Sequence, residues 1–384
     1  MLTKFKKALN FLFTLISFLT KSLKVKTIFF FPFYHTGGAA RVHLDIVKSL
    51  GKKKSIIVFT AYSNNNHFLQ EFNEYAYCFD FKPFLRNVYY NKAINFTFNL
   101  VGYFNKISTL GCNSSYYYDV LKYFNRKVKK IDLLHAFTLP DNGGMEIYSL
   151  PFVNLLDKRI VINKKTKNDF VALYKENNID LVLTNRINVI YNGVEIISNF
   201  SKNYDNKEVL SCIYCGRIAV EKRVDLIVEI GEKVDHNINL SIYGHKEIEI
   251  DGIEKFYKKN IESQEEMNLI YLSSDILLIT SYREGFPMVV MEAMAKGVVC
   301  ICTDVGGISE HIRNGVNGFL VSNKLKDDEI IEKFSSIINE LNTDRDMFKT
   351  ISKNAIEYSK KSFSLNKFKL SYIKLLVISN PKPH

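Results

Sequence analysis

Residues 275–304 read DILLITSYREGFPMVVMEAMAKGVVCICTD, and the pattern in this stretch indicates the architecture of the chain. It predicts a buried strand over Asp275–Thr280, a helix over Pro287–Lys296 with a proline as opening residue, and a second buried strand over Val298–Thr303. Strand, helix and strand in this order are typical of a parallel α/β sheet. Because open α/β sheets bind ligands beyond the carboxyl ends of their strands, the loop before the helix is a candidate site.

The same alternation extends over most of the chain. Residues 26–51 predict a strand, a glycine turn at Gly37 and Gly38, and an amphipathic helix. The asparagine- and tyrosine-rich region 64–130 gives no clear pattern. Further strands are predicted over Ser55–Thr60, Asp132–Ala136, Arg159–Asn163, Leu181–Thr184, Asn188–Tyr191, Val209–Tyr214 and Ile238–Tyr243, and helices over Arg223–Val234, Gln264–Ser273, most of Asp327–Phe363, and Leu365–Val377.

The length and composition predict two domains. A chain of 384 residues, 47% hydrophobic and 24% charged, exceeds what one hydrophobic core usually supports. The polar stretch 198–207 is interpreted as a linker between an N-terminal domain, 25–197, and a C-terminal domain, 208–360. Residues 361–384 are expected to form a helix and tail that cross back to the first domain. We therefore predict two Rossmann-like α/β domains that face each other across a cleft.

Residues 1–24 form a basic segment with five lysines and no acidic residue. Its apolar stretch, Ala8 to Leu19, is too short to span a bilayer, and no obvious cleavage site marks it as a secretory signal. Two interpretations remain open: a helix lying in the membrane interface near anionic headgroups, and an ordinary helix packed on the protein's own surface. We expect a cytoplasmic protein in both cases, attached peripherally to the inner face of the membrane in the first.

The net charge of +12 favours acidic partners, namely nucleic acid, an anionic membrane surface or phosphorylated small molecules. Zinc-finger spacing, aromatic single-strand-binding motifs and dense arginine stripes are absent from the sequence, which excludes the common nucleic-acid-binding classes. The six cysteines lack a regular spacing and are interpreted as reduced thiols. Cys212 and Cys215, and likewise Cys300 and Cys302, are expected to pack in the core because no second pair or nearby histidine completes a zinc site.

Glu284 lies between a predicted strand and a predicted helix, at the candidate site. Free backbone N–H groups at the start of that helix would point into the crevice, and they would bind the negative charges of a diphosphate. The residues of this helix start are Gly285, Phe286, Pro287 and Met288.

Glu292 lies further along the same helix, inside the apolar run VVMEAMA. A carboxylate without a partner is costly in such surroundings, so we expect it to have one. A ribose diol offers two hydroxyl donors. The alternatives are a salt bridge to a neighbouring lysine or arginine, or a solvated helix face.

The loop CGRIAVEKR, residues 215–223, places Arg217 and Lys222 after the first strand of the second half. Two cations beside a helix start suit a pyrophosphate, since charge on a leaving phosphate must be stabilised as a glycosidic bond breaks. The alternative is an ordinary solvated charge cluster with Glu221 and Arg223.

Taken together, these motifs resemble those of glycosyltransferase family four, a large GT-B class of retaining enzymes that use sugar nucleotides. The matching segments occur in the expected order and cover the second half densely and the first half sparsely. They are HTGGAARV at 35–42, VIYNGVE at 189–195, CGRIAVEKR at 215–223, SYREGFPMVVMEAMAKG at 281–297 and DVGGISEHIRNGVNGFLV at 304–321.

The resemblance implies roles for the residues of the second half. Arg217 and Lys222, in the loop that begins with Gly216, would bind the donor diphosphate. Glu292 would bind the ribose, and Glu284 would contact the donor sugar. The segment after YGHKE, which often frames the nucleotide base, is short here, so the resemblance does not distinguish a UDP-sugar from a GDP-sugar.

In the first half, the resemblance implies that Gly37 and Gly38 let the backbone approach the phosphates, as only glycine allows. This loop departs from the family at Ala40, where an acidic residue often stands. The family also has a histidine near the end of a first-domain strand, which could be His135. The alternative is that His135 is a structural residue.

The implied reaction is the transfer of a hexose-type unit, with retention at the anomeric carbon, to a growing bacterial cell-surface glycan of the lipopolysaccharide, O-antigen or capsule type. The expected partners are the nucleotide-sugar donor, a glycan or lipid-linked acceptor and an anionic membrane surface, but no nucleic acid. No cofactor or dedicated metal is expected, because the one Asp-x-Asp motif, Asp344 to Asp346, opens a predicted helix and is interpreted as its cap.

Two other functions remain open. The same fold could serve a sugar-nucleotide 2-epimerase, or a non-catalytic scaffold in a polysaccharide assembly. A nicotinamide-dependent dehydrogenase is disfavoured, because HTGGAARV follows the first strand in place of a G-x-G-x-x-G turn.

Overall fold

The computed structural model describes residues 2–35, 37–137, 143–197, 200–202, 204, 209–261 and 263–377. Most of the predicted linker, 198–207, and the tail beyond residue 377 lie outside the described residues. The chain divides into two compact units. Unit 1 comprises Met1–Ile162, Thr166–Ile190 and Phe368–His384, and unit 2 comprises Asn163–Lys165 and Tyr191–Lys367.

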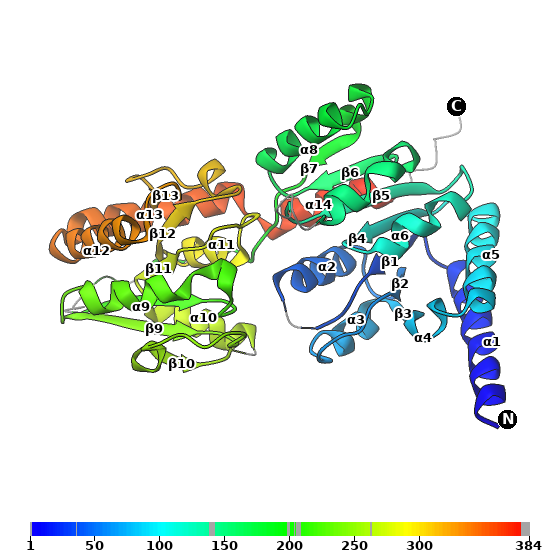
Figure 1. The fold of residues 1–384 in the computed structure, drawn as a ribbon, viewed down its shortest axis with the longest axis horizontal. Coiled ribbons are helices and arrows are strands. Elements are labelled where there is room, and N and C mark those ends of the chain that lie inside the picture. The colour runs from blue at the N-terminus through cyan, green and yellow to red at the C-terminus, as the bar shows by residue number, and fades with distance from the viewer. Residues whose placement is uncertain are drawn as a thin grey trace. The chain divides into compact units, whose positions relative to one another are not determined.

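Unit 1 is built on a seven-stranded parallel sheet of order β3-β2-β1-β4-β5-β6-β7, with helices on both faces (Figure 1). All five residues of β1 are buried, as expected for a central parallel strand. The direction in which strands are added reverses between β1 and β4, which makes this position the switch point of the sheet. The strands are β1 (Thr27–Phe31), β2 (Ser55–Phe59), β3 (Tyr77–Asp80), β4 (Ser108–Cys112), β5 (Lys129–Leu134), β6 (Lys158–Val161) and β7 (Ile187–Val189).

The helices associated with unit 1 include a long N-terminal one that precedes the first strand. The chain also ends in unit 1, because α14 begins in unit 2 and enters unit 1 at Phe368. These helices are α1 (Leu2–Ser22), α2 (Gly38–Ser49), α3 (Leu69–Tyr75), α4 (Lys82–Leu85), α5 (Val88–Phe104), α6 (Ser115–Val120), α7 (Met145–Tyr148), α8 (Lys164–Glu176) and α14 (Leu365–Leu376).

Unit 2 contains a six-stranded parallel sheet of order β10-β9-β8-β11-β12-β13 (Figure 1). Its strands are β8 (Leu210–Cys215), β9 (Ile238–Tyr243), β10 (Tyr257–Lys259), β11 (Ile276–Ile279), β12 (Val299–Asp304) and β13 (Phe319–Ser322), and its helices are α9 (Val224–Lys233), α10 (Gln264–Ser273), α11 (Met288–Ala295), α12 (Asp327–Thr343) and α13 (Arg345–Ser362).

Strand β8 is buried on both faces, which explains why its sequence, LSCIYC, is almost continuously apolar. Cys212 and Tyr214 pack into a core on one face of the sheet, whereas Ile213 and Cys215 pack into a core on the other. Residues three apart on a strand point to opposite faces, so Cys212 and Cys215 cannot share a ligand or a disulfide. Both are buried free thiols, which confirms the prediction of core packing.

Two Rossmann-like parallel sheets confirm the predicted α/β fold class. The prediction of a strand over Leu181–Thr184 is wrong, because these residues open a 3-10 helix, η4 (Leu181–Arg186). Asp180 caps this helix by accepting a hydrogen bond from the backbone N–H of Val182 at 2.9 Å. Leu181 and Val182 are 45% and 67% exposed, so of the apolar run that suggested a strand only Leu183 is buried.

No helix within the described ranges is long and apolar enough to cross a membrane.

Candidate functional site

The candidate site in unit 2 lies where β8 and β11 run side by side. The chain leaves β8 for β9 on one side and returns at β11 on the other, so the crevice beyond these two strands is the switch point at which such sheets bind ligands. Side-chain hydrogen bonds hold the two loops together. The Thr280 hydroxyl donates to the backbone carbonyls of Lys222 at 3.0 Å and Arg223 at 2.8 Å, and the N–H of Tyr282 donates to the carbonyl of Glu221 at 2.9 Å.

Lys222 and Glu284 form an ion pair across this junction. The Lys222 Nζ lies 2.7 Å from Glu284 Oε1, which also accepts a hydrogen bond from the Ser281 hydroxyl at 2.7 Å. The side chains are only 19% and 10% exposed, so water screens their attraction less than it would on an open surface. Two candidates that are 62 positions apart in sequence therefore meet in one cluster.

The helix α11 begins next to this pair. Pro287 is its N-cap, and Met288 is the first helical residue, one position later than predicted. The first N–H groups of a helix have no partner within the helix, and they carry the positive end of its dipole. An anion beside Lys222 would therefore meet two sources of positive potential.

The loop after β12 packs closely against the backbone of Glu284 and Gly285. Gly306 has a positive φ of 60°, and a Cβ atom on it would lie 1.7 Å from the carbonyl oxygen of Glu284. The N–H of Gly307 donates to the carbonyl of Gly285 at 2.6 Å. No role was predicted for these glycines of DVGGISE from the sequence, although two adjacent glycines after a strand are a signal of close backbone approach.

Glu292 has protein partners on α10. Its carboxylate accepts hydrogen bonds from the Tyr271 hydroxyl at 3.1 Å and from the Gln264 amide at 3.2 Å. The expectation that this acid has a partner is confirmed. Neither Tyr271 nor Gln264 was identified from the sequence, because the separation between them and Glu292 carries no local pattern.

Arg217 makes contacts different from those of Lys222. Its guanidinium donates to both carboxylate oxygens of Glu247, at 2.8 and 3.0 Å, and to Glu221 at 2.6 Å. The side chain is 53% exposed, and ion pairs in such positions contribute little to stability. The guanidinium can therefore exchange these carboxylates for another anion at small cost.

Gly216, at the start of this loop, is packed against the loop after β9. Gly244 in that second loop has a φ of 147°, and a Cβ atom on it would lie 1.6 Å from the carbonyl oxygen of Gly216. The N–H of Gly216 donates to the carbonyl of Tyr243 at 3.0 Å. Only glycine at position 244 allows the two loops to approach in this way.

In unit 1, the predicted glycine turn leads into α2. Gly37 is the N-cap of this helix, and Gly38 is its first residue. The φ of Gly37 is 161°, which is extended backbone open to any residue, and a Cβ atom there would have no neighbour within 4 Å. Neither the conformation nor the packing of the protein requires glycine at position 37, and the space beside it is open.

His135 directly follows β5, and its imidazole contacts that of His43 on α2. The two Nε2 atoms are 2.9 Å apart, so one of them donates and the other accepts. His43 is buried and stacks on Phe31 with ring centroids 4.4 Å apart. Burial lowers the pKa of His135 to about 4, and burial together with His135 lowers the pKa of His43 well below its usual range. Both rings are neutral at physiological pH.

This neutral pair predicts a fall in stability on acidification. The folded pKa of His135 is about 4 and its ordinary value is 6.5, so the unfolded chain binds more protons between these pH values. The contribution of His135 to the free energy of unfolding is therefore fully present above pH 6.5 and is lost as the pH falls towards 4. We expect His135→Gln to reduce this slope in urea titrations at a series of pH values.

The matched control is His236→Gln, since His236 is exposed. It should leave the pH slope of the free energy of unfolding as in the wild type. The slope of His135→Gln should be reduced but not abolished, because burial also lowers the pKa of His311 to about 4. A slope unchanged by His135→Gln would contradict the neutral pair.

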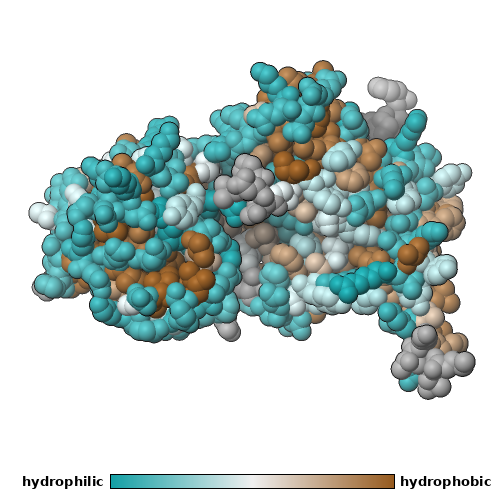
Figure 2. All heavy atoms as spheres, in the orientation of Figure 1, coloured by the Kyte–Doolittle hydropathy of each residue, from teal (hydrophilic) through white to brown (hydrophobic). Residues whose placement is uncertain are grey.

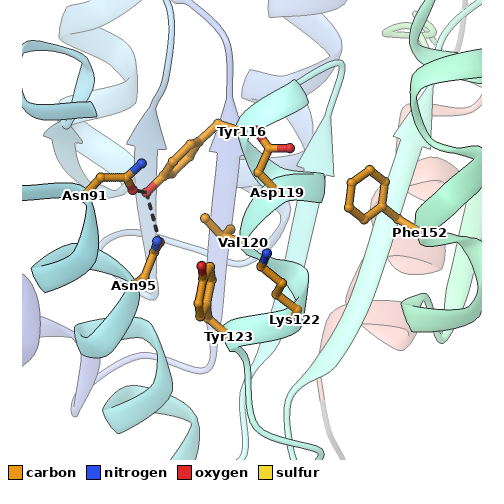
Figure 3. Close-up of a pocket in the computed structure, with 8 residues that line it drawn as sticks. All are labelled: Asn91, Asn95, Tyr116, Asp119, Val120, Lys122, Tyr123 and Phe152. Atoms are coloured by element: carbon orange, nitrogen blue, oxygen red, sulfur yellow. Dashed lines mark hydrogen bonds between the residues drawn. The ribbon is translucent and has the colours of Figure 1, made fainter. Parts of the chain in front are cut away.

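A small polar pocket lies elsewhere in unit 1, between α5 and the segment that begins with α6 (Figure 3). Its volume is about 260 Å³, below the roughly 300 Å³ from which ligand pockets usually start. The Tyr116 hydroxyl at its wall already donates to the Asn91 amide oxygen at 3.2 Å. It contains none of the residues predicted for the donor site.

Asp344 is the N-cap of α13 and accepts a hydrogen bond from the N–H of Met347 at 2.8 Å, which confirms its interpretation as a helix cap. Within the part of the chain that the structure describes, no three histidine, cysteine, aspartate or glutamate side chains group in a way that could hold a metal ion.

Comparison with known protein families identifies the family that most of unit 2 matches. Residues 195–357 match the family model of group 1 glycosyl transferases. These residues form a group 1 glycosyltransferase domain. The match contains Arg217, Lys222, Glu284 and Glu292, so the site described above belongs to the group 1 domain, and the resemblance drawn from the motifs is confirmed.

Relatives of the group 1 domain include proteins of known and unknown activity. An uncharacterized glycosyltransferase of Methanocaldococcus jannaschii is 32% identical over 200 residues, which are 50% of this chain and 54% of that protein. A lipopolysaccharide 1,2-N-acetylglucosaminetransferase of Salmonella typhimurium is 27% identical over 139 residues, 31% of this chain and 36% of that protein. The chain thus spans about half or less of the length of these curated relatives.

Solved structures extend the likeness beyond the group 1 domain. HepE of Anabaena in complex with UDP has a TM-score of 0.70 at 16% identity, covering 91% of this chain and 99% of that chain. A glycosyltransferase from Rickettsia africae has a TM-score of 0.69 at 19% identity, and the alignment covers 91% of this chain and 97% of that chain. These likenesses show the fold, which is the GT-B type with two Rossmann-like units.

Proposed function

We propose that this protein is a retaining glycosyltransferase that transfers a sugar from a UDP- or GDP-sugar to a cell-surface glycan. The observation that carries the proposal is the Lys222–Glu284 pair, at the switch point of the group 1 domain and beside the start of α11. It puts a cation, a carboxylate and a helix N-terminus where a sugar diphosphate requires them.

The donor diphosphate is assigned to Lys222, Arg217 and the start of α11. As the bond between sugar and phosphate breaks, negative charge grows on the leaving phosphate, and cations already in place lower the barrier. Lys222 is held there by Glu284. Arg217 is exposed and can move from Glu221 and Glu247 to a phosphate. The backbone N–H groups of Gly285, Phe286 and Met288, with the turn made by Pro287, complete the anion site, and Gly216 keeps the loop close to it.

The donor sugar and ribose are assigned to the two glutamates. Lys222 and Ser281 both bond Oε1 of Glu284, so Oε2 can accept a hydrogen bond from a sugar hydroxyl. Glu292, which Tyr271 and Gln264 orient, is assigned to the two hydroxyls of the ribose. No resident metal is assigned a role.

We assign the binding of the acceptor to unit 1. The open space at Gly37, directly before the first helical residue Gly38, allows the backbone to come close to a ligand, and His135 can offer a neutral imidazole to a sugar hydroxyl. Relatives named as lipopolysaccharide transferases of Salmonella typhimurium and Escherichia coli support a glycan acceptor in the cell envelope. We place the reaction at the cytoplasmic face of the membrane, where a lipid-linked acceptor is accessible.

Ligand-induced stabilisation tests the donor half. At a concentration about 100 times its Kd, a bound nucleotide adds about 2.7 kcal/mol to the free energy of unfolding. We expect UDP, which is bound in the HepE complex, or GDP to raise the Tm, and Glu292→Gln to remove most of that rise. Glu340→Gln, on the exposed face of α12, is the control that should keep it. If neither nucleotide nor any of their sugar conjugates shifts the Tm, the donor assignment fails.

Product analysis tests the reaction. The protein is incubated with each UDP- or GDP-sugar that binds and with lipopolysaccharide-derived acceptors, and nucleotide release and the anomeric proton of the product are followed by NMR. We expect release together with the donor's own anomeric configuration. Inversion would overturn retention, and conversion of the donor to an epimer without nucleotide release would establish the epimerase instead.

A further inference from the structure

The N-terminal helix α1 has two apolar faces, and only one of them is packed. Phe11, Leu15 and Phe18 are buried in the core of unit 1, and Phe11 stacks on Tyr90 of α5 with ring centroids 4.3 Å apart. The other face is exposed to solvent, with Phe5 at 69% exposure. Its members follow one another at helical spacing and form one stripe: Phe5, Leu9, Leu12, Phe13 and Ile16.

The neighbouring helix α5 adds a second exposed stripe. Tyr89, Phe96 and Tyr103 are seven residues apart, so they share one face of the helix, and Tyr89 is 81% exposed. α1 and α5 pack against each other, and hydrophobic atoms appear on the surface at their end of unit 1 (Figures 1 and 2). We call the exposed apolar residues of these two helices the α1–α5 surface.

The charged side chains of α1 and α5 themselves are all positive. The sequence has no acidic residue before Asp45 and none between Asp80 and Asp119, the two segments that contain α1 and α5. The exposed cations beside the stripes are Lys6, Lys7, Lys24, Lys92 and Lys106. Large aromatic side chains on helices that carry only positive charges complement a layer of apolar chains covered by anionic headgroups.

We propose that the α1–α5 surface binds the surface of an anionic lipid bilayer, with α1 lying in the plane of the interface. The packed face of α1 fixes the helix to unit 1, and the exposed face enters the headgroup region. A second copy of this chain fits less well, because a symmetric contact would bring lysines against lysines, and interface cores are depleted in lysine. The inference deepens the proposed function, on which it rests for a lipid-linked acceptor.

Vesicle flotation of the full chain tests the surface. We expect binding to phosphatidylcholine vesicles that contain phosphatidylglycerol, little binding to phosphatidylcholine alone, and release at high salt. Phe5→Ser with Phe13→Ser on α1, or Phe96→Ser with Tyr103→Ser on α5, should each weaken binding roughly tenfold or more. Lys6→Gln with Lys7→Gln and Lys24→Gln should weaken it by roughly fivefold per lysine removed.

The control pair is Val182→Ser with Leu370→Ser, which removes exposed apolar side chains of unit 1 outside the α1–α5 surface and should leave binding unchanged. Circular dichroism and the nucleotide-induced rise in Tm check folding and donor binding in every variant, so a failed donor site is recognised separately. Absence of binding to the anionic vesicles, or wild-type binding by all three sets of variants, would overturn the proposal. So would a dimer in sedimentation that the same variants dissociate.

Discussion

Replacing Lys222 with alanine is expected to reduce sugar transfer roughly a hundred- to a thousandfold, the usual effect of removing one preorganised group that stabilises transition-state charge. Two losses combine. In the proposed site the leaving phosphate loses one of its cations, and Glu284, only 10% exposed, loses the ammonium group 2.7 Å from its carboxylate. Because the effect belongs to the transition state, kcat should fall more than the affinity for the nucleotide.

The measurement is the rate of nucleotide release with acceptor present, for Lys222→Ala, Glu284→Ala and the double variant. The two side chains act as one unit, so we expect the double variant to be hardly slower than either single one. Lys233→Ala, which breaks an exposed ion pair with Glu332 in the same unit, is the control and should retain normal turnover. Normal turnover in folded Lys222→Ala would remove this pair from the mechanism.

Replacing Gly306 with alanine is expected to destabilise unit 2 strongly. The new Cβ would lie 1.7 Å from the carbonyl oxygen of Glu284, and the φ of 60° disfavours any L side chain. Steric overlap and backbone strain together should lower the free energy of unfolding by roughly 2–6 kcal/mol. In the fraction of the Gly306→Ala variant that folds, Glu284 should be displaced and donor binding should be lost.

Gly315→Ala separates these two causes. Gly315 has a φ of 71°, but no atom lies within 4 Å of its Cβ position, so only backbone strain of roughly 1–2 kcal/mol applies. Urea unfolding of both variants gives the difference. If the two lose the same free energy, the close approach of the β12 loop to Glu284 is not what makes position 306 sensitive.

The parts of the fold that could be predicted are those in which the local pattern and the tertiary environment agree. The strand β11 and the helix α11 are apolar and largely buried, and α11 begins after Pro287 and ends just before Gly297, so their positions follow from the sequence alone. The strand β4, STLGC, is also fully buried, yet it offers no such run. The Ser108 hydroxyl donates to the carbonyl of Leu376, 268 positions away, and a window along the chain cannot detect a partner so distant.

The candidate site could be predicted as a set of residues but not as a geometry. The sequence places Lys222 beside Arg217, and both cations were associated with phosphate. In the structure, the Thr280 hydroxyl holds the backbone of Lys222 next to β11. The Lys222 side chain binds Glu284, whereas the Arg217 side chain binds Glu247. Which carboxylate each cation meets depends on the order of the strands in the sheet, and local spacing carries no information about that order.

The last helix has a consequence for how the protein is made. Phe368, Tyr372 and Leu376 of α14 are buried, and they belong to unit 1, most of whose other residues precede Ile190. Domains usually fold in order as they leave the ribosome. Here the sheet of unit 1 is synthesised first, but its core remains open until the final residues emerge. A chain truncated before residue 368 would therefore contain the whole of unit 2 but lack the α14 side chains that complete the core of unit 1.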